Sequence, residues 1–384
     1  MEPPIIGIES FFFSVLLSII LVIYAIMFLP IVRYSFKIKT KNRWNSLTVI
    51  ILLIVIATFI GLPLSATIFY LFAPLNYYAI VVAGSLLVFF FIFATISKSS
   101  SHEDDFNKKL SNGINNKLEK SILDTYNFTP AQEMKRKMIH LFSIFYLAAW
   151  TLEPLIFFGV SILYNLSMNT TTKESYINAQ SLFEYENFEI LLMNGLIIQF
   201  FMFICIFFGI ANMEIMRLRF KKKDYLFRKT MQTTRRPTEI NDISASILLI
   251  LGLTMSALIL TYNAENRIEG IYAHMGVISI SVLSDMFAAL IGRKWGKHKW
   301  PIVKGKSYEG SLAGFLVGFF SALIFVGWVL ALIGALIFLI TDIVLAKVKI
   351  SDNASNPILL AITFKILIQF VDPMIYTLPF IKIW

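Results

Sequence analysis

The chain has 384 residues, of which 57% are hydrophobic and only 15% are charged, and its mean hydropathy is +0.72. Apolar runs of about 20 residues, each able to cross roughly 30 Å of hydrocarbon, recur along the whole chain and exclude an ordinary water-soluble protein. The net charge of +10 comes from Lys and Arg residues between particular runs, so it indicates membrane topology and no nucleic acid binding.

Ten predicted membrane spans make the expected fold an all-α, polytopic membrane bundle, because runs of this length satisfy their backbone polar groups in lipid as helices. The spans cover about residues 5–31, 46–72, 75–97, 138–163, 190–213, 244–262, 271–292, 311–329, 332–347 and 357–379. The first run is too long for a signal-peptide core, so we expect it to be retained as a helix. The expected regions are a three-helix membrane region (1–97), a polar cytoplasmic linker (98–130) and a seven-helix catalytic membrane domain (131–384).

Most Lys and Arg residues lie in the linkers after predicted spans one, three, five and seven. Such loops stay on the cytoplasmic side, and the intervening linkers near 73–76, 165–189 and 263–270 carry few cations. We therefore expect an integral protein of the endoplasmic reticulum membrane in a eukaryote, or of the cell membrane in a prokaryote. Its basic loops would face the cytoplasm, where nucleotides are found.

Asp285 is a carboxylate near the inner end of the seventh predicted span, where a charge in hydrocarbon costs a few kcal/mol. On a helix it shares one stripe with Ala289, Gly292 and Gly296. Two interpretations stay open. The small residues leave room for a ligand beside the acid, or they form a close helix–helix contact in which a neighbouring Ser or Arg satisfies Asp285.

The loop after this span is strongly basic and contains three glycines. Its cations are Arg293, Lys294, Lys297, His298, Lys299, Lys304 and Lys306, and its glycines are Gly292, Gly296 and Gly305. The next span begins at Gly310, so its free N–H groups and positive dipole end would point into the loop, as in many phosphate sites. We expect an anion site here, the alternative being charge that only sets topology. Trp300 stands where a P-loop requires glycine, which excludes that motif.

Smaller polar clusters flank other spans. They are Arg136, Lys137 and His140 before span four, Glu214 with Arg217 after span five, Arg236 with Glu239 before span six, and Asp352 with Asn353 before Pro357. Taken singly, the Glu and Arg spacings are typical of helical ion pairs, and Asp352 with Asn353 is typical of a turn. Together with Asp285 and Glu309, however, Asp352 offers the hard oxygen ligands that Mg²⁺ prefers.

The order of these elements resembles the CTP-dependent lipid kinases, which include dolichol, phytol and diacylglycerol kinases and are distantly related to phosphatidate cytidylyltransferases. In that family an Asp, a small-residue stretch, a Gly/basic loop and a K-[ST]-x-E-G element form the CTP-binding region. Here they are Asp285, Gly292 to Gly296, and Lys306 to Gly310.

The remaining family elements follow in the same order over about 220 residues, and residues 1–130 contribute nothing. Arg136-Lys137…His140 matches R-K-x-x-H, Glu214…Arg217 matches E-x-x-R, Arg236…Glu239 matches R-x-x-E, and Asp352-Asn353…Pro357 matches D-N-x-x-x-P. The family usually has a Glu shortly before the D-N element, where this chain has Asp342, to which no fixed role is assigned. The signature runs of the cytidylyltransferases are absent, which favours phosphoryl transfer.

The resemblance implies a dolichol kinase that moves the γ-phosphate of CTP to the terminal hydroxyl of a long-chain isoprenoid alcohol, with Mg²⁺ as cofactor. Asp285, Glu309 and Lys306 would be catalytic, with Asp285 or Glu309 orienting the alcohol. Asp285, Asp352 and Asn353 would hold the metal. Nucleotide-binding residues would be Gly292, Arg293, Gly296, Lys304, Ser307, Gly310, Arg136, Lys137 and His140, and supporting residues Glu214, Arg217, Arg236 and Glu239.

Other functions remain as alternatives. Within the same class they are phytol kinase, diacylglycerol kinase and CDP-lipid cytidylyltransferase. A membrane transporter would place Asp285 on an ion path, but a transport path needs polar groups near mid-membrane, whereas the charged groups here gather at one face.

Overall fold

A computed structural model describes residues 8–38, 40, 43–61, 203–204, 206–219, 242–261, 267–303, 305–348 and 351–370. Within these ranges every regular element is a helix, apart from an isolated backbone bridge between Lys299 and Ser307. Predicted spans three and four and the linker 98–130 lie outside the described residues. The total of ten spans and the domain division at residue 131 therefore stay predictions.

The described helices match the predicted spans closely. They are α1 (Ile8–Lys37), α2 (Arg43–Gly61), a helical segment at 206–218, α11 (Ala245–Thr261), α12 (Arg267–Ser279), the π-helical turn η3 (Ile280–Ser284), α13 (Asp285–Lys294), α14 (Tyr308–Val348) and α15 (Asp352–Ile368). Among the described residues, four stretches are long and apolar enough to cross a membrane: Val15–Lys37, Arg43–Ile60, Glu269–Lys294 and Tyr308–Ala346. The chain is thus a helical, integral membrane protein.

Helix α14 folds back on itself at Gly327. Its 41 residues would measure about 60 Å if straight, roughly twice the hydrocarbon thickness. Gly327 instead has φ 71° and ψ 175°, and the side chain of Lys306 reaches Asp342 near the other end of the helix. The two halves are therefore antiparallel and correspond to predicted spans eight and nine.

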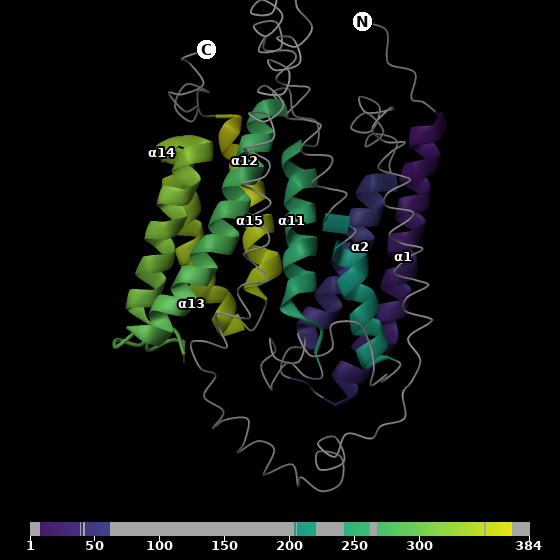
Figure 1. Ribbon diagram of the computed structural model, residues 1–384, viewed down its shortest axis with the longest axis horizontal. Coiled ribbons are helices and arrows are strands. Elements are labelled where there is room, and N and C mark those ends of the chain that lie inside the picture. Colours follow the sequence, from purple (N-terminus) through teal and green to yellow (C-terminus); the bar gives the residue numbers. More distant parts are fainter. Residues whose placement is uncertain are drawn as a thin grey trace, which may run out of the picture.

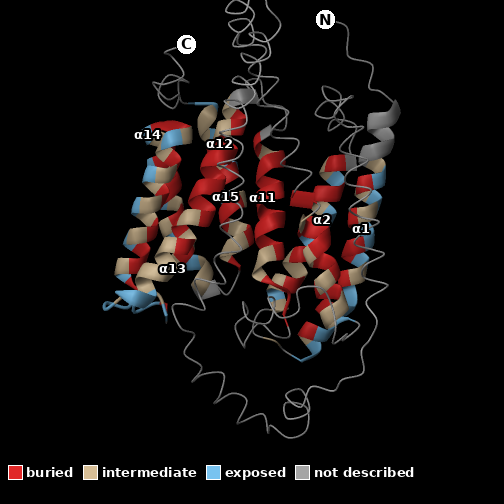
Figure 2. Ribbon diagram, in the orientation of Figure 1, coloured by how far each residue is buried: buried red, intermediate tan, exposed pale blue. Residues whose placement is uncertain are grey.

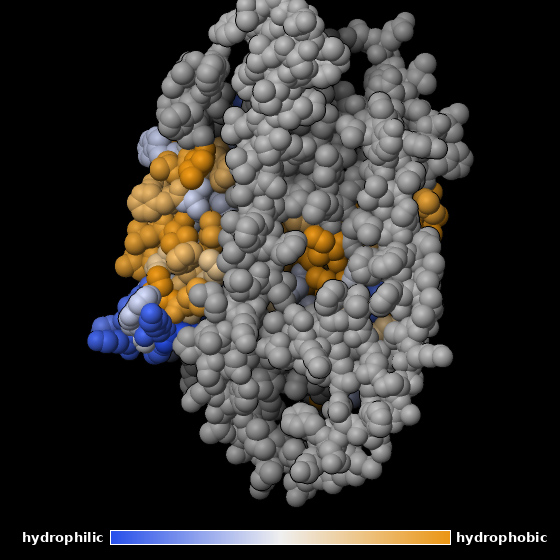
Figure 3. Space-filling model, viewed as in Figure 1, coloured by the Kyte–Doolittle hydropathy of each residue, from blue (hydrophilic) through white to orange (hydrophobic). Residues whose placement is uncertain are grey.

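Both halves of α14 present apolar side chains outward at every fourth residue. These are Leu312, Leu316, Phe320 and Ile324 in the first half and Trp328, Leu332, Leu336, Ile340 and Val344 in the second, each between 37% and 61% exposed. Buried residues instead line the centre of the bundle (Figure 2). The apolar flank on α14 (Figure 3) is the surface expected of helices that face lipid.

The basic connections share one end of the bundle. The loop between α13 and α14 and the junction between α1 and α2 both lie at the lower end in Figure 1, where α15 also begins. This agrees with the predicted grouping of the basic linkers after spans one and seven on one face. That this face is cytoplasmic stays a prediction.

The first two helices join the same core as the later ones. Helix α1 packs on α2, and α2 packs on α11. Tyr24 of α1 is buried against Phe207 and Phe208 and donates a hydrogen bond from its hydroxyl to Asn212 Oδ1 at 2.9 Å. Residues before the predicted catalytic domain therefore help to build the core.

Replacing Gly327 with Ala should destabilise the protein, because a Cβ is strained at φ 71° and such backbone positions cost about 1–3 kcal/mol. The measurement is thermal unfolding in detergent. Leu332→Ala, a lipid-facing change within the second half of α14, serves as control. Equal melting temperatures for the two variants would contradict the tight reversal at Gly327.

Candidate functional site

Helices α13 and α14 approach closely through small residues. A Cβ added to Gly310 would stand 2.6 Å from the carbonyl oxygen of Ala288, and one added to Gly314 would stand 2.9 Å from the Ala288 Cβ. One added to Gly318 would collide with the Ser284 hydroxyl. The small residues thus form a close helix–helix contact, in which Ser284 and Ala288 take the places predicted for Asp285 and Ala289. That a neighbouring Ser or Arg satisfies Asp285 stays a prediction. Asp285 lies beside this contact.

Gly292 and Gly296 belong to the same contact, because a Cβ on either would meet the Ser307 side chain. Ser307 caps α14 by accepting a hydrogen bond from the Gly310 N–H at 3.1 Å. The Gly310 N–H is therefore already paired. A role for these glycines and Ser307 in nucleotide binding stays a prediction.

The basic loop folds back as a short, hairpin-like turn. The N–H of Tyr308 donates to the His298 carbonyl at 2.9 Å, and that of Trp300 donates to the Lys306 carbonyl at 3.1 Å. The Trp300 and Tyr308 rings stack with centroids 3.9 Å apart, and the indole N–H of Trp300 donates to Ser311 Oγ at 3.0 Å. Most of this basic loop is thus fixed against the start of α14.

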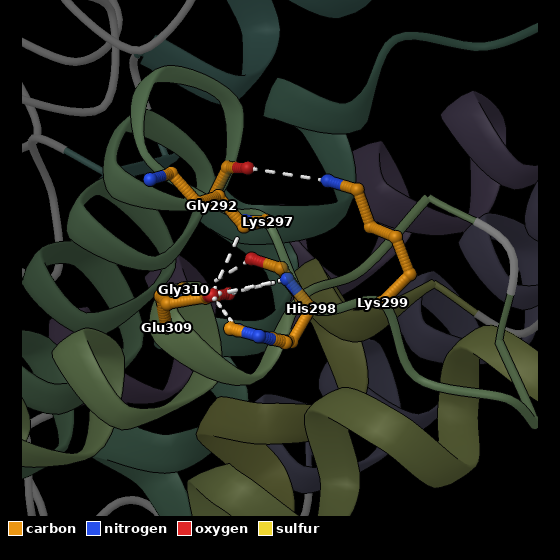
Figure 4. A network of polar contacts seen from close by, with 7 residues as sticks. Gly292, Lys297, His298, Lys299, Glu309 and Gly310 are labelled. Atoms are coloured by element: carbon orange, nitrogen blue, oxygen red, sulfur yellow. Dashed lines mark hydrogen bonds and ion pairs between the residues drawn. The ribbon is translucent and has the colours of Figure 1, made fainter.

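Glu309 anchors the other side of the loop (Figure 4). Its Oε1 accepts hydrogen bonds from the backbone N–H groups of Lys297 at 3.1 Å and His298 at 3.0 Å. The His298 ring places Nδ1 2.7 Å from the same oxygen. One carboxylate oxygen is therefore committed to the loop, which is a structural use that the sequence did not indicate. The predicted catalytic role of Glu309 stays a prediction.

Lys306 turns inward, away from the other cations of the loop. Its Nζ forms an ion pair with the carboxylate of Asp342 and donates to the Asp342 backbone carbonyl at 2.5 Å. The side chains of Lys306 and Asp342 are only 24% and 6% exposed. A buried charge of this kind needs a partner, and the pair joins the loop to the second half of α14.

Two further acidic side chains, from two other helices, lie within electrostatic range of this pair. Asp285 at the start of α13 and Asp352 at the start of α15 both act electrostatically on the Asp342 carboxylate. Asp285 and Asp352, which are predicted to share a site, thus lie near a common acid despite their separation in sequence.

The beginning of α15 differs from the turn that Asp352 and Asn353 suggest when taken alone. Both residues lie in the first helical turn, and the Asn353 amide donates to Asp352 Oδ1 at 3.2 Å. Gly252 of α11 allows this turn to approach, since a Cβ there would stand 2.9 Å from the Ala354 carbonyl oxygen. An acid in a first turn is favoured by the helix dipole, so Asp352 also stabilises α15.

The other predicted residues fall into two groups. Glu214 and Arg217 form the expected ion pair at 2.6 Å, and Arg217 also donates to the Asp242 carbonyl at 2.7 Å, so the pair fixes the start of α11. Arg293 is exposed at the end of α13. Arg136, Lys137, His140, Arg236, Glu239 and Lys304 lie outside the described residues. Their roles stay predictions.

Asp342 is the residue to which the sequence assigned no role and which the structure places at the centre of the cluster. An acid inside an apolar span is itself a signal of function or pairing. The partner, however, is 36 residues away and becomes a neighbour only through the reversal of α14. The apolar run alone does not reveal that reversal.

The donor set suits a metal that arrives with a nucleotide. Among the described residues no group of three or more His, Cys, Asp or Glu side chains is arranged to hold a metal unaided. Mg²⁺ usually takes one or two protein carboxylates together with substrate phosphates. Asp285 and Asp352, which both act electrostatically on Asp342, would supply those carboxylates, and their metal-binding role stays a prediction.

Comparison with characterised proteins finds a partial match to a lipid kinase. Over 118 residues the chain is 30% identical to CTP-dependent diacylglycerol kinase 1 of Saccharomyces cerevisiae, a stretch that covers 30% of this chain and 37% of the yeast protein. The chain thus matches little more than a third of that relative. No protein-family profile and no solved structure matches. The similarity supports kinship with the CTP-dependent lipid kinases and leaves the lipid acceptor open.

Replacing Glu309 with Gln should loosen the basic loop, because hydrogen bonds to a charged acceptor are stronger than those to a neutral amide. We expect the backbone amides of Lys297 and His298 to exchange hydrogen about tenfold faster or more. Hydrogen–deuterium exchange in detergent measures this, with Tyr308→Phe as the control that keeps the ring stack. Unchanged exchange in the Glu309 variant would contradict the anchoring role.

Proposed function

We propose that the chain transfers the γ-phosphate of CTP to the hydroxyl group of a membrane lipid alcohol. The observation that supports this most directly is the Lys306–Asp342 pair at the basic end of the bundle, on whose acid Asp285 and Asp352 both act electrostatically. Phosphoryl transfer depends on positioning and charge neutralisation more than on covalent chemistry by the protein. A buried lysine beside carboxylates that can share a metal supplies both.

Each residue has a distinct part in the proposed reaction. Lys306 has three N–H donors, so it can contact the CTP phosphates while Asp342 keeps it oriented. Asp285 orients the acceptor hydroxyl and takes its proton, a part that Glu309 is less suited to because its Oε1 holds the loop. The acceptor oxygen bonds to the γ-phosphorus, the bond to the β–γ bridging oxygen breaks, and CDP leaves.

Mg²⁺ bound with CTP would be held by Asp285 and Asp352, with the Asn353 amide oxygen beside them, and would neutralise charge on the phosphates. The loop residues Arg293 and Lys304 would bind the outer phosphate oxygens. Arg136, Lys137 and His140 would complete the nucleotide site from span four. These assignments rest on the motif resemblance together with the shared location of Asp285, Asp342 and Asp352.

The lipid acceptor has two candidates. The motif order resembles the polyprenol kinases, which favours dolichol or a related isoprenoid and hence dolichyl phosphate as product. The yeast relative is named a diacylglycerol kinase, which favours diacylglycerol. In both lipids a hydroxyl lies at the headgroup level above long apolar chains, which suits a site at one end of a lipid-facing bundle.

The deciding experiment offers γ-labelled CTP, ATP, GTP or UTP to the purified protein with dolichol, phytol, diacylglycerol or undecaprenol in detergent. We expect labelled lipid from CTP with one acceptor class. Absence of labelled lipid with every donor would contradict the kinase assignment. Label arriving only from α-labelled CTP would identify a cytidylyltransferase instead.

Replacing Lys306 with Met should lower kcat by about 100-fold or more, as for the loss of a single charge-stabilising donor in other active sites. Asp342→Asn should have a similar effect, because the lysine loses its orienting partner. The measurement is the initial rate of lipid phosphorylation. Lys37→Met removes an exposed cation at the same end of the bundle and should retain full activity. Comparable rates for all three variants would contradict the role of the pair.

Removal of divalent cations with EDTA should abolish transfer, and added Mg²⁺ should restore it. Asp352→Asn should raise the Mg²⁺ concentration for half-maximal rate by about tenfold or more, as expected when a metal site loses a supporting group. Thr363→Ala, further along α15 where the hydroxyl bonds only its own helix, is the control. If the Asp352 variant needed the same Mg²⁺ concentration for half-maximal rate, the assignment of Asp352 as a metal ligand would be wrong.

A further inference from the structure

The exposed surface of the basic loop is both cationic and apolar. Lys294, Lys297 and Lys299 are exposed there, and Trp295 and Ile302 are 57% and 58% exposed. We propose that these five residues, the outer loop surface, bind the headgroups of anionic phospholipids. The proposal concerns lipid binding and holds or fails independently of the kinase activity.

The location of the outer loop surface is the first argument. The hydrophilic loop projects sideways at the lower end of the apolar flank formed by α14 (Figure 3). Leu312 and Leu316, the first lipid-facing residues of α14, are 57% and 42% exposed just after the loop ends. A loop that protrudes beside the end of a lipid-facing helix lies at the depth of the headgroups.

The composition of the surface is the second argument. The Lys294 ammonium lies over the Trp295 ring, 4.4 Å from its centroid, so a cation and an exposed aromatic ring form one unit. Trp side chains prefer the membrane interface, and each Lys near an anionic surface adds about 1 kcal/mol of attraction, or about fivefold in binding. Charge that only set topology would account for the lysines but not for two large apolar side chains left in the open.

The third argument is the hydrogen bonding of the loop, because it directs Lys306 into the bundle and fixes the backbone at Lys297 and His298. Glu309 accepts hydrogen bonds from the Lys297 and His298 amides, while Lys306 is directed to Asp342 inside the bundle. Lys294, Lys297 and Lys299 are exposed, with Lys299 Nζ 3.5 Å from the Gly292 carbonyl oxygen, whereas Lys306 is largely buried. At the depth of the headgroups, the phosphate groups of lipids are the most abundant anions.

The test uses Ile302→Cys labelled with bimane in a Cys205→Ala background, since Cys205 is the single native cysteine. The full chain is placed in nanodiscs containing doxyl-labelled phosphatidylglycerol or doxyl-labelled phosphatidylcholine at equal fractions. We expect quenching by phosphatidylglycerol to exceed that by phosphatidylcholine about threefold or more at low salt. The ratio should approach one in high salt, because screening shortens the range of surface charge.

Replacing Lys294, Lys297 and Lys299 together with Gln should abolish the preference for phosphatidylglycerol. Arg33→Gln with Lys37→Gln removes exposed cations from the end of α1 and should leave the preference intact. Equal quenching by both lipids in the native loop would overturn the proposal, as would the absence of quenching by either. Loss of CTP affinity in the triple variant with an unchanged lipid preference would assign the lysines to the nucleotide and also overturn it.

Discussion

The ion pair between Lys306 and Asp342 is the interaction on which the site depends. Neither charge is well solvated, so each needs the other, and their contact requires the basic loop to meet the far half of α14. The carboxylates of Asp285 and Asp352 both act electrostatically on Asp342. One end of the apolar bundle thus carries both positive and negative side chains. In the proposed reaction, the nucleotide phosphates would bind the positive groups and the metal would bind the carboxylates.

Backbone features bring these charges together. The positive φ of Gly327 lets α14 reverse within the bundle, and Gly310, Gly314 and Gly318 let its first half lie close against α13. The π-helical turn Ile280–Ser284 directly precedes Asp285 and is buried against the same helix. Turns of this kind insert an extra residue and rotate the next helical segment, and they are frequent at functional sites. The direction of Asp285 thus depends on that turn as well as on its position in sequence.

The sequence predicts the helices well because their cause is local. Apolar runs and polar linkers bound the spans that appear as α1, α11, α13 and the two halves of α14. Contacts between side chains on different helices have a different cause. The pairing of Lys306 with Asp342, the Ser307 cap and the anchoring by Glu309 depend on which helix faces which, and one sequence does not contain that register. Asp352 and Asp285 both act electrostatically on Asp342, and their sharing of one site, which the order of the motifs predicts, stays a prediction.

The most direct test is a double-mutant cycle on Lys306→Met and Asp342→Asn, measured as unfolding free energy in lipid-containing detergent. If the two side chains are paired, the double variant loses much less stability than the sum of the single variants, with a coupling energy of about 1 kcal/mol or more. Additive losses, within about 0.5 kcal/mol, would show that the two side chains are not paired and would contradict the proposed site.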